Sequence, residues 1–137
     1  MLKQISVFLE NTPGVLSKFT KIIQDNNVNL RALTVAETAD FGILRTLVDK
    51  TEECVKVLRK NNYLVSIADV IAIQIPDKPG SLHEIAEILG DNDINIEYIY
   101  STLIRQEAII VLKVDDIEKA VRILEDNGVK LVKNQDF

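Results

Sequence analysis

The residue types that carry most enzyme chemistry are scarce in this sequence. It contains one histidine (His83), one cysteine (Cys54) and no tryptophan. A nucleophile elbow, a Walker loop and a cluster of metal ligands are all missing. Cys54 lies beside apolar residues on a helix face, which favours a buried core residue over a reactive thiol. His83 follows a Pro-Gly pair, where an exposed helix residue is the simplest interpretation and a ligand contact the alternative. The sequence therefore predicts no catalytic residue, no metal site and no cofactor.

Two loops of the same form are better candidates for binding chemistry. They read Asn11-Thr12-Pro13-Gly14 and Asp77-Lys78-Pro79-Gly80, each between an alternating apolar segment and an amphipathic one. The N-terminus of a helix has unpaired N–H groups and partial positive charge, which suit a carboxylate. Glycine lets a ligand approach the backbone, and Asn11 can donate and accept hydrogen bonds. A plain turn with proline at a helix start remains the alternative.

Asparagine recurs at the start of the next expected strand, as Asn29 and Asn95. Asparagine is depleted in strands, so its presence at both places needs a physical reason. Either it satisfies its own backbone in a turn, or its amide points toward a ligand over the neighbouring loop.

Both loops belong to a duplication that needs no gap. Pro79-Gly80 follows Pro13-Gly14 at an offset of 66 residues (79 − 13). The same offset aligns many further pairs, among them Ile5 with Ile71, Asn26 with Asn92, Val48-Asp49 with Val114-Asp115, and Asn61 with Asn127. A register held over the whole chain indicates two copies, joined near Ala68-Asp69.

The elements that must position these loops follow from periodicity. Each copy reads as strand, helix, strand, strand, helix, strand. Strands are expected at Ile5–Leu9, 28–36, 43–48 and 64–67, and at Ile71–Ile75, 94–102, 108–114 and 129–132. The first helices carry an apolar face made of Val15, Leu16, Phe19, Ile22 and Ile23, or of Leu82, Ile85, Ala86, Ile88 and Leu89. The second helices are expected to begin near Asp49 and Asp115, which are good capping residues, and to end at Asn61 and Asn127-Gly128.

This order predicts an α+β fold of two tandem ferredoxin-like βαββαβ units, residues 1–68 and 69–137. Each unit has an antiparallel sheet with both helices on one face. A unit of this size buries only about 60% of its unfolded surface and is marginal alone. We therefore expect the halves to pack together and the chain to form a homodimer.

Composition narrows the range of partners. The formal net charge is −5 at pH 7 and the pI about 4.9, so no basic stripe is available for nucleic acid or an anionic membrane surface. The chain lacks the apolar segment of a signal peptide or a membrane span, and a single cysteine excludes an intrachain disulfide. These features favour a cytoplasmic protein that binds neither nucleic acid nor membrane.

The motifs resemble those of the ACT domain family of small-molecule regulatory modules. The first copy carries the resemblance in residues 9–16 and 26–30, and the second in residues 75–82 and 92–96. Two copies without a catalytic domain are similar to stand-alone tandem ACT proteins, described as amino-acid-binding or acetolactate-synthase-regulatory-like. Residues 36–45 also look like a segment of that subgroup.

The resemblance implies ACT units side by side in a continuous sheet, with a free amino acid bound at their interface. The contacts would come from the first loop and the start of the second strand. Carried over, the ligand-binding residues are Asn11, Pro13, Gly14, Val15, Leu16, Asn29 and Leu30 in the first copy, and Asp77, Gly80, Ser81, Leu82, Asn95 and Ile96 in the second. The walls from Val15, Leu16 and Leu30 suit an apolar ligand side chain.

The second copy departs from the pattern at Asp77 and Lys78, which replace asparagine and threonine. A carboxylate repels the anionic end of an amino acid, although Asp77 could hold the ammonium instead. We therefore expect two unequal sites, with the Asn11 loop the stronger. The function expected is an amino-acid sensor or regulatory protein, and the alternative is a regulatory subunit of a partner enzyme such as acetolactate synthase that binds no ligand.

Overall fold

The computed structural model describes residues 1–37, 40–104 and 107–134. The chain divides into two compact units, Lys3–Ala68 and a second made of Asp69–Phe137 with Met1–Leu2. Below, these are the first unit and the second unit. The boundary between the units falls between Ala68 and Asp69, and the first two residues group with the second unit.

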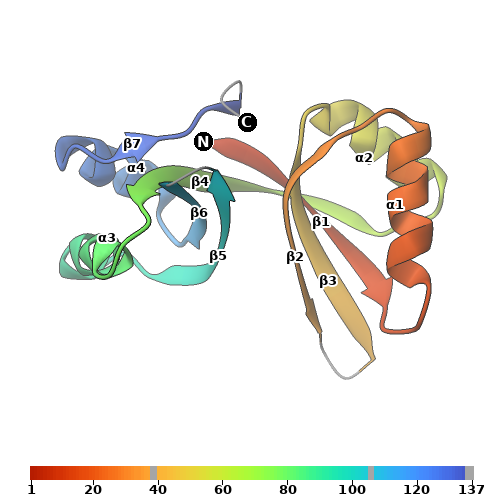
Figure 1. The fold of residues 1–137 in the computed structure, drawn as a ribbon, viewed down its shortest axis with the longest axis horizontal. Coiled ribbons are helices and arrows are strands. Elements are labelled where there is room, and N and C mark those ends of the chain that lie inside the picture. The colour runs from red at the N-terminus through yellow and green to blue at the C-terminus, as the bar shows by residue number, and fades with distance from the viewer. Residues whose placement is uncertain (38–39, 105–106, 135–137) are drawn as a thin grey trace. The chain divides into compact units, whose positions relative to one another are not determined.

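The first unit has the expected βαββα order. Its elements are β1 (Leu2–Glu10), α1 (Val15–Asp25), β2 (Leu30–Glu37), β3 (Phe41–Val48) and α2 (Thr51–Lys60), followed by the start of β4 (Val65–Pro76). Strand β3 lies between β1 and β2 and is antiparallel to both. Both helices cover one face of this sheet (Figure 1).

The second unit repeats the arrangement with the rest of β4, α3 (Ser81–Asp91), β5 (Ile96–Ile104), β6 (Glu107–Val114), α4 (Ile117–Asp126) and β7 (Lys130–Leu131). Strand β6 lies between β4 and β5, and β7 pairs with β4. The expected βαββαβ order is thus confirmed in both copies. The last strand of the first copy and the first strand of the second were expected separately, yet they form the single strand β4, because no turn residue separates them.

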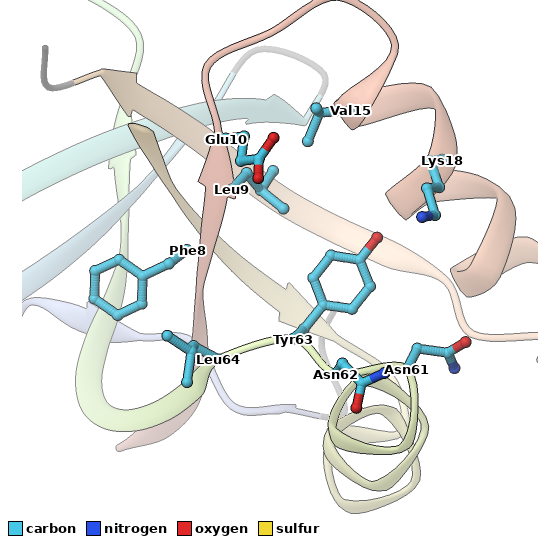
Figure 2. Close-up of a pocket in the computed structure, with 9 residues that line it drawn as sticks. All are labelled: Phe8, Leu9, Glu10, Val15, Lys18, Asn61, Asn62, Tyr63 and Leu64. Carbon is cyan, nitrogen blue, oxygen red and sulfur yellow. The ribbon is translucent and has the colours of Figure 1, made fainter. Parts of the chain in front are cut away.

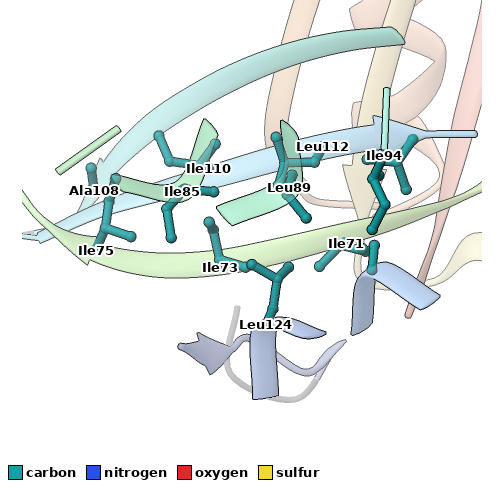
Figure 3. Packing of buried hydrophobic residues seen from close by; sticks show 12 residues of the cluster. Ile71, Ile73, Ile75, Ile85, Leu89, Ile94, Ala108, Ile110, Leu112 and Leu124 are labelled. Atoms are coloured by element: carbon teal, nitrogen blue, oxygen red, sulfur yellow. The ribbon is translucent and has the colours of Figure 1, made fainter. Parts of the chain in front are cut away.

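Each unit has its own apolar core between the sheet and the helices. In the first unit it joins Ile5, Val7, Phe19, Leu44 and Leu58, which are all fully buried. Figure 3 shows the corresponding core of the second unit, where Ile71, Ile73, Leu89, Leu112 and Leu124 interlock. The alternation of β1 and β4 and the helical period therefore identified most of the core.

All four helices end in the same way. The side-chain amides of Asn26, Asn61, Asn92 and Asn127 each donate to the carbonyl four residues earlier, at 2.8 Å. The amide adds a hydrogen bond to a carbonyl of the last helical turn without lengthening the helix. At Asn26, Asn61 and Asn127 the same carbonyl also accepts from the asparagine's own backbone N–H, at 3.3, 3.1 and 3.1 Å. The expected helix ends are therefore confirmed.

The second helices begin near Asp49 and Asp115 as expected, but the expectation that these aspartates cap them was wrong. The N-cap residues are Lys50 and Asp116, and in each copy the preceding aspartate has another partner. Its Oδ1 accepts from the backbone N–H of the asparagine before the second strand, Asn29 or Asn95, at 3.0 Å. These aspartates fix the start of β2 and of the segment leading to β5.

Three residues assigned to the core faces of the first helices are also exposed. Leu16 and Leu82 are 47% and 46% exposed, and Ala86 is exposed as well. Each stands next to a residue that points inward, and a step of one residue turns a helix by about 100°. The two leucines are consequently free to contact something other than their own core.

Candidate functional site

The Asn11 loop places an open helix N-terminus at the end of β1. Gly14 is the N-cap of α1 with φ +85°, a left-handed conformation that costs glycine nothing, and no side chain caps the helix. Within the described part of the chain, the N–H groups of Leu16 and Ser17 have no acceptor. The first turn carries no acidic residue. This end of α1 is therefore suited to an anion.

A carboxylate that the sequence did not single out lies at the same loop. The Asn11 Nδ2 donates to the Oε2 of Glu37, the last residue of β2, at 3.1 Å. The bond leaves the Asn11 carbonyl oxygen available as an acceptor. Glu37 falls in residues 36–45, which resemble the tandem subgroup, and that is the one signal that pointed to it. An anion-binding helix end and a carboxylate thus occur together.

The second copy keeps the loop geometry and changes its chemistry. Gly80 is again a left-handed N-cap, with φ +93°. The hydroxyl of Ser81 is buried, and its Oγ has no hydrogen-bond partner in the described residues. Here Glu84 lies in the first turn and Asp77 is exposed in the loop. Position 103, which corresponds to Glu37, is a leucine. The second copy therefore carries Asp77 in the loop and Glu84 in the first turn of α3, where the first copy has Asn11 and Lys18.

The asparagines before the second strands have satisfied backbones and free side chains. Asn29 N–H donates to the Asp49 carboxylate, and Asp49 N–H donates to the Asn29 carbonyl at 3.3 Å. Asn95 and Asp115 repeat both bonds. No side-chain amide bond of Asn29 or Asn95 occurs among the described residues. An open groove of about 710 Å³ lies here, lined by Asn29, Leu30 and Lys50 among others.

The two halves of the predicted site do not meet within one unit. The Asn11 loop is at the start of α1, and Asn29 follows its end. An 11-residue helix spans about 16 Å at 1.5 Å per residue. Figure 1 shows the two loops at opposite ends of α1. The expectation that the asparagine reaches the neighbouring loop is therefore wrong for a loop of the same unit.

A more enclosed cavity lies near the start of α1, inside the first unit. Its volume is about 360 Å³ (Figure 2). It is bounded by the end of β1, the start of α1 and the segment joining α2 to β4, through Leu9, Val15, Lys18, Asn62, Tyr63 and Leu64 among others. Of the predicted ligand-binding residues, Val15 alone lines it. Burial raises the pKa of the Tyr63 phenol, which therefore stays a neutral donor.

The remaining reactive residues behave as structural ones. Cys54 is fully buried, and burial, with a smaller contribution from Asp49, raises its pKa from 9.0 to about 11. His83 is exposed and lies 3.2 Å from the Glu87 carboxylate one turn later. Among the residues described, no group of three or more histidine, cysteine or acidic side chains could hold a metal, and no helix is long and apolar enough to cross a membrane.

Comparison with known proteins assigns the family. The family model of the ACT domain pair matches residues 1–137. The chain belongs to the ACT domain pair family. ACT domains are amino-acid-binding regulatory modules rather than catalytic ones. No curated protein sequence matches the chain significantly.

Several solved structures share the fold. Protein BT0572 from Bacteroides thetaiotaomicron is 37% identical, with a TM-score of 0.94 over 98% of this chain and 94% of that one. The regulatory subunits of aspartate kinase from Thermus thermophilus and Thermus flavus are each 14% identical, with TM-scores of 0.68 and 0.66. They cover 90% of this chain and 91% and 90% of their own. At that identity they show a common fold of tandem ACT units.

Proposed function

We propose that this ACT domain pair is a regulatory sensor of a free amino acid. The observation that carries the proposal is the pairing of an uncapped α1 N-terminus with Glu37 at the Asn11 loop. The N–H groups of Leu16 and Ser17 would bind the ligand carboxylate, and Glu37 and the Asn11 carbonyl would bind its ammonium. A zwitterion is the small molecule that uses both charges.

The ligand site would be completed by a second ACT unit. Because Asn29 lies at the far end of α1, a site that joins it to an Asn11-type loop needs the loop of one unit and the asparagine of another. The free amides of Asn29 and Asn95 and the exposed side chains of Leu16 and Leu82 support this proposal. The second unit could come from the same chain or from a homodimer partner. A ligand held between units can change their association, which is how binding would regulate a partner enzyme.

The two sites would be unequal. In the first copy the first turn of α1 has no acidic residue, whereas in the second Asp77 and Glu84 both lie near the helix end that would receive the ligand carboxylate. Like charge weakens anion binding there. We therefore propose that the first-copy site is occupied at lower ligand concentration.

A thermal-shift screen of the free amino acids tests the function, because a ligand of the native state raises the melting temperature. We expect at least one amino acid to stabilise the chain, and Glu37→Gln to reduce that stabilisation while Glu53→Gln on the exposed face of α2 leaves it unchanged. If no amino acid stabilises the protein, the sensor proposal fails and a regulatory subunit that binds no ligand is the better account.

A further inference from the structure

We propose that the helix-free face of the sheet in the first unit is an interface through which two copies of the chain associate. This face lies on the other side of the sheet from the apolar core, and its middle strand is β3. None of the residues that carry the proposal belongs to the proposed amino-acid site. The interface is therefore independent of ligand binding.

Alternation along the strands assigns the residues of this face. Val7 and Leu44 are paired across β1 and β3, and both lie in the core. The next pair, Phe8 and Ile43, therefore points to the other face of the sheet. By the same alternation, the outward residues of β3 include Phe41, Ile43 and Arg45.

Three apolar side chains on this face are exposed and adjacent. Phe8 and Phe41 are 42% and 43% exposed, and their rings meet edge to face with centroids 6.0 Å apart. Leu64 is 72% exposed and lies beside Phe8, whose N–H donates to the Leu64 carbonyl at 3.2 Å. Figure 2 shows the Phe8 ring directed away from Leu9 and toward the side of Leu64. Together they leave roughly 300 Å² of apolar surface, and patches of that size are often functional.

The second copy forms the same sheet without these groups. The residues that correspond to Phe8, Arg45 and Leu64 are Gln74, Val111 and Lys130. Strands β4 and β6 nevertheless pair in the same register as β1 and β3. The fold therefore requires neither the apolar patch nor the cation, which favours an interaction confined to the first unit.

The order of the outward residues on β3 selects a second copy as the partner. The strand presents an aromatic ring, an aliphatic side chain and a cation, at Phe41, Ile43 and Arg45. A two-fold axis that runs across the strands above Ile43 reverses this order in the second copy. Each Arg45 then faces the Phe41 ring of the other copy, and the two Ile43 side chains meet at the axis. A guanidinium over an aromatic ring is a cation–π contact, and the symmetry makes two of them.

The charges around β3 permit this contact between two acidic chains. Ile43 and Arg45 are paired with uncharged neighbours on both sides, namely Phe8, Ser6, Ala36 and Thr34. Two chains of net charge −5 can therefore approach at a face where the cation is central. Stacking uses the flat face of the half-buried Arg45 guanidinium, so its N–H groups can still donate within their own chain.

The area of the patch determines the strength of association that we expect. Packed sheets lie about 10 Å apart with their strands within about 30° of each other, which leaves room for these side chains between them. A stable interface buries about 800 Å² per partner, and the apolar patch supplies less than half of that. We therefore expect a weak dimer that forms as the protein concentration rises.

Sedimentation equilibrium of the full chain over a wide concentration range, without any amino acid, tests the interface. We expect the average mass of the wild type to rise with concentration. Phe41→Lys should raise the dissociation constant about five- to thirtyfold, because each dimer loses two cation–π contacts. Arg45→Glu should act in the same direction for the same reason. The double variant Phe41→Lys/Arg45→Glu places opposite charges across the axis and should associate more tightly than either single variant.

Leu33→Lys is the matched control, since Leu33 is 45% exposed but points to the helix side of the same sheet. It should leave the dissociation constant unchanged, and urea unfolding verifies that every variant is folded. A wild type that remains monomeric across the range overturns the interface. So does association that Leu33→Lys weakens and Phe41→Lys does not. A double variant that associates no better than the single variants overturns the two-fold arrangement of Arg45 and Phe41. Because no amino acid is present, each of these results is separate from the outcome of the thermal-shift screen.

Discussion

Alanine at two glycines of the same helix region should change stability in opposite directions. Gly80 is the left-handed N-cap of α3, and Gly90 lies inside that helix. A Cβ added at either position meets no heavy atom within 4 Å, so steric contact contributes nothing in either case. What differs between the two sites is the backbone conformation.

The magnitudes follow from that difference. A left-handed conformation costs an L-residue roughly 1–2 kcal/mol, so Gly80→Ala should lower the free energy of unfolding by about that amount. Alanine within a helix is favoured over glycine by about 0.5–1 kcal/mol, so Gly90→Ala should raise it. Gly14→Ala in the first copy should behave like Gly80→Ala, because its φ is also positive.

Urea unfolding followed by circular dichroism measures both changes on the same scale. We expect the transition midpoint to fall for Gly80→Ala and to rise for Gly90→Ala, with similar slopes. A midpoint for Gly80→Ala that equals or exceeds the wild-type value would contradict the left-handed cap, and with it the geometry on which the proposed carboxylate site depends.

Three further predictions test other parts of the structure. Leu89→Ala removes a fully buried side chain from the second core and should cost about 3–5 kcal/mol in urea unfolding, whereas Leu82→Ala, nearly half exposed in the first turn of α3, should cost under about 1 kcal/mol. Asp49→Ala leaves the Asn29 N–H without its carboxylate acceptor and should destabilise the protein by about 1–3 kcal/mol. Amide hydrogen exchange should increase most at the start of β2, and an increase elsewhere instead would refute the hydrogen bond between Asn29 and Asp49. The free energy of unfolding should fall as pH rises from about 9 toward 11, because the Cys54 thiol ionises near pH 9 in the unfolded chain but keeps its proton to about pH 11 when buried. Cys54→Ala should flatten that pH dependence. A pH dependence that is unchanged in Cys54→Ala would show that the thiol is not buried in solution.

The fold was largely readable from the sequence because it depends on repetition. Period-two alternation in β1 and β4 and the amphipathic pattern of α1 and α3 fixed the element order twice, in one register. The N-cap residues of the second helices could not be predicted from the sequence in the same way. Asp49 has the residue type and position of a helix cap. Its carboxylate instead accepts from the backbone N–H of Asn29, 20 residues away, and only the folded chain brings the two together.

The candidate site was readable in part. The Pro-Gly loops identified the open helix ends, since the left-handed N-cap is a local property of glycine. Glu37 could not be assigned, because its contact with Asn11 joins residues 26 positions apart across a sheet. The cavity beside Tyr63 was missed for the same reason. Its lining comes from three separate segments, and none of them carries a recognisable motif.

Amide NMR during titration with the amino acid that gives the largest thermal shift tests the central claim most directly. If the ligand carboxylate binds the α1 N-terminus, the Leu16 and Ser17 resonances should shift first, and those of Leu82 and His83 should shift at higher ligand concentration. Resonances at both helix starts that stay in place while the ligand binds would contradict the account.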